Sequence, residues 1–77
     1  MIREKIISII ALVLEKKESE ISLESNNSNL DNWGSVQNLF ISSDIENEFG
    51  IDLSPDDIAN FNSVLEIEKI IKKHKTQ

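Results

Sequence analysis

Few side chains in this chain could take part in chemistry. There is no cysteine and one histidine, His74, so a thiolate metal site, a protein-borne thiol nucleophile and a histidine-rich zinc site are excluded. Ten serines remain; Ser35 opens a helical pattern, and only the strings around it, given below, single it out from the others. A serine in that position usually caps a helix, and no general base is evident beside it. We therefore predict that the chain is not an enzyme.

Calcium is the metal that an acidic, asparagine-rich loop would favour, and the residue spacing tests for it. A calcium-binding loop begun at Asn27 would take Asn29 and Asp31 as its next ligands. It would then need Gly where Asn32 stands and Glu where Asn38 stands. Both requirements fail, so we predict no metal site.

Size and charge narrow the function further. With 77 residues, the chain is expected to form a single domain over residues 1–77. Its 14 acidic residues against 8 basic ones give a net charge of −6, which disfavours binding to nucleic acid or to an anionic membrane. Twelve acidic residues and no Lys or Arg lie between Glu18 and Glu68. This acidic stretch is either a solvated face or a surface that attracts basic partners.

The N-terminal segment superficially resembles a signal peptide, because Arg3 and Lys5 precede the apolar run 6–14. Charged residues 15–18 stand where a small-residue cleavage site would be, and the apolar run is too short to span a bilayer. We therefore expect a cytoplasmic protein. Separately, we expect a monomer.

The apolar spacing predicts helices and no strand. Four helices are expected: residues 2–17, residues 35–49 ended by Gly50, a short one from Ser54-Pro55 to near Asn60, and one opened by a capping box at 63–66. A polar loop, residues 18–34, separates the first two helices. The predicted fold is therefore all-α, with three main helices, one short helix and a long first loop.

The same spacing predicts which residues face inward. Ile21, Leu23, Leu30 and Trp33 are expected to anchor the long loop on the core. The second helix is expected to turn Val36, Leu39, Ile45 and Phe49 inward, with Ile41 or Phe40 sharing the rest, and the last helix Val64, Ile67, Ile70 and Ile71.

Two strings resemble the acyl carrier protein family: LDNWGSV at 30–36, and DIENEFGI at 44–51, which closes the second helix. Members of that family have a turn ending in a serine that is followed by an aliphatic residue. A helix then closes with acidic residues, Phe and Gly, and a short Pro/Asp-led helix and a final helix follow. Residues 51–58 and 61–64 match those last parts, so the resemblance covers essentially the whole chain in order.

The resemblance implies a small four-helix bundle whose serine, here Ser35, is covalently loaded with 4′-phosphopantetheine from coenzyme A. The arm would carry acyl or aminoacyl groups as thioesters for a fatty-acid, polyketide or other specialised biosynthetic pathway. The arm would also supply the thiol that the chain itself lacks. Its phosphodiester would lie at the N-terminus of the second helix, where backbone N–H groups favour an anion.

The resemblance also implies partners. A phosphopantetheinyl transferase would modify Ser35, an acyl- or aminoacyl-activating ligase would load the arm, and downstream acyl-transfer enzymes would bind through basic patches. Asp44, Glu46 and Glu48 match the acidic recognition helix of the family, and Val36 would be the apolar contact beside the serine.

Two positions depart from the family pattern. Gly34 stands where the family commonly has Asp, a residue associated with recognition by the transferase, and Ser42-Ser43 stand where it often has a large apolar residue. The first departure supports an alternative function, that of an unmodified carrier-like adaptor which binds other proteins through its acidic surface. A second alternative is an unrelated small helical interaction module.

Overall fold

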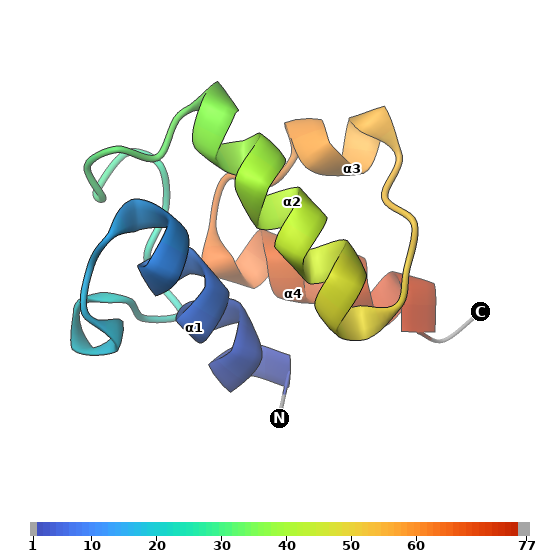
Figure 1. The fold of residues 1–77 in the computed structure, drawn as a ribbon, viewed down its shortest axis with the longest axis horizontal. Coiled ribbons are helices and arrows are strands. Elements are labelled where there is room, and N and C mark those ends of the chain that lie inside the picture. The colour runs from blue at the N-terminus through green and yellow to red at the C-terminus, as the bar shows by residue number, and fades with distance from the viewer. Residues whose placement is uncertain (1, 76–77) are drawn as a thin grey trace.

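Helices form where the sequence predicts them, and Figure 1 shows how they pack. The computed structural model describes residues 2–75. Its elements are α1 (Ile2–Leu14), a 3-10 turn η1 (Glu18–Glu20), α2 (Ser35–Phe49), α3 (Pro55–Ala59) and α4 (Val64–Lys75). Over residues 2–75 there is no strand, only one isolated bridge between Asn26 and Ser63. The prediction of an all-α bundle with three main helices and one short helix is confirmed.

The core lies where α1, α2 and α4 face one another, with α2 running diagonally across α4 in Figure 1. Its fully buried side chains are Ile6, Ile10, Leu14, Ile41, Ile45, Phe61, Val64, Ile67 and Ile71. The loop anchors are confirmed as well: Ile21 and Trp33 are buried, and Leu23 and Leu30 pack against the core half-buried. None of the helices within residues 2–75 is long and apolar enough to cross a membrane.

The first helix is shorter than predicted, because α1 ends at Leu14 rather than at Lys17. Glu15 adopts the left-handed conformation at φ 57°, and the Lys16 N–H donates to the Ala11 carbonyl at 2.9 Å instead of continuing the helix. This turn sends the chain into η1 and lets Ile21 reach the core. Burial of that later side chain outweighs the helical propensity of Glu15, Lys16 and Lys17.

The inward face of α2 is also partly different from the prediction. Ile41 and Ile45 are fully buried, whereas Val36, Leu39 and Phe40 are 57%, 61% and 59% exposed. The expectation that Val36 and Leu39 face inward is therefore wrong. The reason is the helical face: Val36, Leu39 and Phe40 lie on the same side of α2 as the exposed Ser43 and Asn47, whereas the opposite side bears the buried Ile41, Ser42 and Ile45.

The remaining helix ends follow their local signals. Gly50 ends α2 in the left-handed conformation at φ 65°, which glycine adopts without steric cost. Ser54 and Asp57 cap the start of α3 reciprocally: the Ser54 Oγ accepts from the Asp57 N–H at 3.1 Å, and the Asp57 carboxylate accepts from the Ser54 N–H at 3.2 Å. At the start of α4 the Ser63 Oγ accepts from the Glu66 N–H at 3.1 Å.

Two buried carboxylates tie the terminal helices to the bundle. Asp57 of α3 accepts from His74 Nε2 at 2.8 Å and from Lys73 Nζ at 3.1 Å, both on α4. Glu68 of α4 accepts two hydrogen bonds from the Arg3 guanidinium, at 3.0 and 3.2 Å. The hydrogen bond from His74 holds the pKa of Asp57 well below its usual range, and the hydrogen bonds from Arg3 lower the pKa of Glu68.

These lowered pKa values predict acid sensitivity. A carboxyl whose pKa is lower in the folded state stabilises the fold above its unfolded pKa of about 4, and that contribution is lost as the pH falls below it. We expect Asp57→Asn to lower the free energy of unfolding by ~2 kcal/mol at pH 7, because it weakens charged hydrogen bonds at a buried site. The same variant should lose less stability than the wild type between pH 6 and pH 3.

Urea unfolding followed by circular dichroism across that pH range measures both effects. Asp52→Asn is the matched control, since Asp52 is exposed and precedes the same helix. Equal acid dependence in Asp57→Asn and the wild type would contradict a role for Asp57 in holding α3 on α4.

Candidate functional site

Ser35 is the first residue of α2, and its side chain is exposed. Gly34 occupies the N-cap position, so Ser35 does not cap the helix. Within residues 2–75 the Ser35 hydroxyl makes no hydrogen bond to another residue, whereas Ser54 and Ser63 use theirs as caps. Ser35 therefore presents a hydroxyl that the fold does not use.

The surroundings of Ser35 suit an anionic group. Backbone N–H groups in the first turn of a helix have no acceptor within the helix, and the helix dipole adds positive character there. The first turn of α2 contains no acidic residue that would compete with an anion. Gly34 adds no side chain, and its own N–H is satisfied by Gln37 Oε1 at 3.1 Å. The start of α2 can therefore hold a phosphate attached to Ser35.

A surface groove of about 680 Å³ is lined by Ser35 together with residues from the start of α2, from α3 and from the segments next to them. Its lining is partly apolar, from Leu39, Pro55, Ile58 and Ala59, and partly polar, from Asn27, Asn38 and Asn62. Trp33 and Gly34 complete it. The groove is large enough for a flexible arm or a small acyl group to lie along the protein surface.

Trp33 and Asn38 hold the end of the long loop against α2. Trp33 is 6% exposed, and its indole N–H donates to Asn38 Oδ1 at 2.6 Å. Because these residues lie on either side of Ser35 in the chain, their contact sets where α2 begins relative to the core. From the sequence, Asn38 is assigned no role in the site; it stands only where a calcium-binding loop would need Glu. A buried tryptophan needs an acceptor for its N–H, which is the signal that could have identified this pair.

The residues predicted to bind partners all lie on α2, and they differ in how freely they are available. Val36 is exposed beside Ser35, next to the exposed Leu39 and Phe40. The Glu46 carboxylate accepts from the Leu53 N–H at 2.8 Å, and Glu48 pairs with Lys5 of α1 at 2.8 Å.

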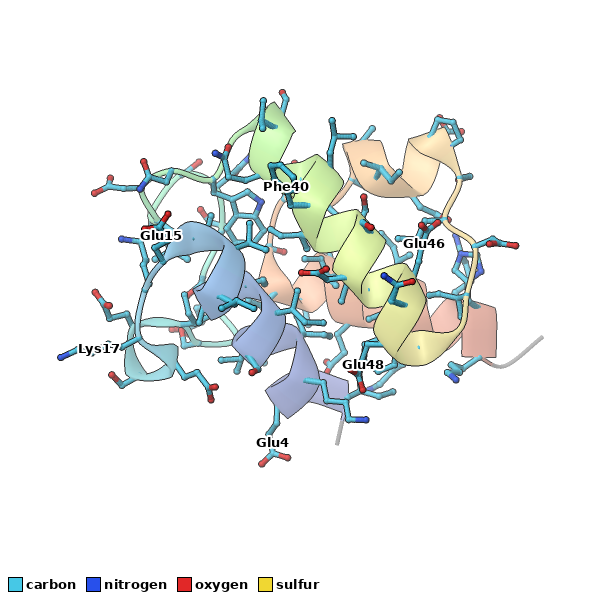
Figure 2. All side chains as sticks on the ribbon, viewed as in Figure 1. Glu4, Glu15, Lys17, Phe40, Glu46 and Glu48 are labelled. Carbon is cyan, nitrogen blue, oxygen red and sulfur yellow. The ribbon has the colours of Figure 1, made fainter. Side chains whose placement is uncertain are left out.

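Figure 2 shows Phe40 and Glu46 well separated along α2, with Glu48 farther toward its C-terminal end. Asp44, which lies between Phe40 and Glu46 in the sequence, is half-buried. The structure thus adds an apolar patch, Val36, Leu39 and Phe40, that the sequence analysis did not combine.

The two serines that depart from the family pattern have different environments. Ser42 is 4% exposed, and its hydroxyl donates to the Leu39 carbonyl at 2.9 Å, whereas Ser43 is exposed. A large apolar side chain at position 42 would meet the core. Ser43 is exposed to solvent on the same helix as Ser35, so it is a suitable control for substitutions of Ser35.

Comparison with known proteins agrees with the geometry around Ser35. A family model described as a phosphopantetheine attachment site matches residues 4–71. The chain is also 32% identical over 75 residues to an acyl carrier protein of Rickettsia bellii (strain RML369-C). This alignment covers 97% of this chain and 87% of that protein.

The contact between Trp33 and Asn38 predicts how substitutions at position 38 behave. We expect Asn38→Ala to lower the free energy of unfolding by about 1–2 kcal/mol, because the buried indole N–H loses its acceptor. Asn38→Asp keeps an acceptor oxygen and adds a negative charge near the start of α2, so it should cost less. Chemical denaturation followed by circular dichroism compares the two variants. Equal destabilisation by both would contradict the hydrogen bond as the cause.

Proposed function

The chain belongs to the phosphopantetheine-binding family of acyl carrier proteins, and on that premise we propose that Ser35 is the residue that bears the arm. Acyl carrier proteins carry acyl groups and are not enzymes, which confirms the prediction that the chain is not an enzyme. Their cofactor is covalently attached 4′-phosphopantetheine. The observation that supports Ser35 most directly is its exposed hydroxyl at the start of α2, without a partner among residues 2–75.

The residues around Ser35 fit the arm. The N–H groups of the first turn of α2 would bind the phosphodiester, and Gly34 would leave its approach open. When attached, the arm supplies a terminal thiol on which acyl or aminoacyl groups are carried as thioesters. The groove beside Ser35 would shelter part of the arm or its cargo from water.

We propose that residues 1–77 act as one carrier domain in the cytoplasm. Proteins of this family interact with phosphopantetheinyl transferases and with acyl-handling enzymes. For this chain we propose in addition an acyl- or aminoacyl-activating ligase, and downstream enzymes of a fatty-acid, polyketide or other specialised pathway. They would bind α2 by charge at Asp44, Glu46 and Glu48 and by apolar contact at Val36.

One observation favours the alternative function, an unmodified acidic adaptor. Gly34 gives the transferase no carboxylate beside the serine, while α2 still offers exposed apolar and acidic side chains to a partner. An aspartate could be accommodated at position 34, because its φ of −118° suits any residue. A Cβ there would meet only the flexible end of Gln37, at 3.2 Å. Gly34→Asp therefore tests whether the missing carboxylate limits modification.

Attachment is tested by intact mass after incubation with coenzyme A and a broad-specificity phosphopantetheinyl transferase. We expect one phosphopantetheine on the wild type, none on Ser35→Ala, and one on Ser43→Ala, which removes an exposed hydroxyl from the same helix. Gly34→Asp should be modified faster than the wild type. No addition to the wild type or to Gly34→Asp, with several transferases, would overturn the carrier proposal in favour of the adaptor.

Partner binding is tested by removing charge without removing hydrogen-bond acceptors. In the variant Asp44→Asn/Glu46→Gln/Glu48→Gln, the glutamine at 46 can still accept from the Leu53 N–H. We expect this variant to be modified more slowly by the transferase at low salt. The difference should shrink as added salt screens the charges.

The matched control is Glu15→Gln/Glu18→Gln/Glu24→Gln, which makes the same change in net charge at exposed positions in the segment before α2. Equal slowing in both triple variants would indicate an effect of net charge alone. That result would contradict recognition through α2.

A further inference from the structure

Two asparagine side chains in the groove beside Ser35 have hydrogen-bond donors that the fold does not use. An indole N–H can only donate, so Asn38 must turn its Oδ1 toward Trp33, which it contacts at 2.6 Å. This leaves the Nδ2 group of Asn38 without an acceptor within residues 2–75. The hydrogen bond thus orients the amide and leaves its donor end available.

Asn62 offers a second amide, on an exposed side chain. Its Oδ1 accepts from Asn27 Nδ2 at 3.4 Å, and its backbone carbonyl accepts from the Asn27 N–H at 2.9 Å. These contacts hold Asn62 against the long loop, and its Nδ2 has no acceptor in the part of the chain that the structure describes. Asn38 of α2 and Asn62, which lies between α3 and α4, therefore bring two amide groups to the lining of one groove.

Beside these amides the groove has an apolar wall, formed by Leu39, Ile58 and Ala59. Asn38 is half-buried, whereas Asn62 is exposed. A saturated acyl chain lying there would contact the apolar wall but would displace water from the Asn38 donor without pairing it. A covered donor without an acceptor is unfavourable, because it loses its hydrogen bonds to water. An acyl group that carries an oxygen atom would contact the same apolar wall and also accept from an amide.

We propose that Asn38 and Asn62 make this groove selective for acyl groups with a keto or hydroxyl oxygen, against saturated groups of the same length. The inference rests on the proposed attachment of the arm to Ser35. Asn38 and Asn62 are specificity residues in this proposal, because they would touch the cargo and take no part in any reaction. Selectivity would come from the hydrogen bond that an oxygen-bearing group gains and from the water that a saturated group displaces at the half-buried Asn38.

The experiment uses the protein loaded by a phosphopantetheinyl transferase from coenzyme A, butanoyl-, 3-hydroxybutanoyl- or 3-oxobutanoyl-coenzyme A, with each product checked by intact mass. Proton–nitrogen NMR then reports the side-chain amides of Asn38 and Asn62 and the indole of Trp33. We expect both amides to shift in the 3-oxobutanoyl and 3-hydroxybutanoyl forms. In the butanoyl form, the signals of both amides should have the same chemical shifts as in the protein that carries the arm without an acyl group.

Thioester hydrolysis gives a second readout. Asn38→Asp keeps an acceptor for Trp33 and removes the amide donor. The 3-oxobutanoyl thioester should therefore hydrolyse roughly fivefold faster on this variant than on the wild type, which corresponds to the loss of one hydrogen bond. Asn47→Asp makes the same change at an exposed position of α2 outside the groove and should leave the rate unchanged.

The outcomes separate this inference from the proposed function. A protein that takes up no arm by mass would overturn attachment at Ser35 and the inference with it. Loaded forms in which butanoyl and 3-oxobutanoyl groups shift the amides equally would overturn the inference alone. The same holds if the form loaded from coenzyme A already shows the full shift, because the arm itself would then occupy the donors.

Discussion

Mutual burial of isoleucine side chains from α1, α2 and α4 is the interaction on which the rest of this structure depends. Ile6, Ile10, Ile41, Ile45 and Ile67 are all fully buried, and each contributes on the order of 2 kcal/mol by leaving water. A chain of this size has only one thin core. The long loop therefore contributes Ile21 and Trp33 to this core. The position of Trp33 in turn fixes where α2 begins, and Ser35 is the first residue of that helix.

Charge has two roles in the molecule, and the structure separates them. Asp57 and Glu68 are buried and join α3 and α1 to α4, so they belong to the fold. Glu46 and Glu48 also have partners within the chain but remain partly accessible on α2. The acidic stretch is therefore neither wholly a solvated face nor wholly a binding surface.

In the proposed function, the exposed features of α2 would let a small carrier bind several enzymes. Ser35 and the apolar patch Val36, Leu39 and Phe40 are exposed on α2, and the groove shares Ser35 and Leu39 with them. Acidic residues follow on the same helix, where they can guide a basic partner toward the serine. Contacts of this kind form and break quickly, which suits a protein that must pass its cargo on.

Local signals in the sequence determined the helices and the expected site. Gly50, Ser54-Pro55 and the box at 63–66 act within a few residues of themselves, so the start and end of α2 and the starts of α3 and α4 were predictable. The ordered family motifs indicated Ser35 in the same way. Only the tertiary structure decided which face of α2 is buried, where α1 ends, and which buried acids have partners. Those features depend on residues far apart in the chain, such as Arg3 with Glu68 and Asn27 with Asn62, and the packing of helices alone brings such residues together.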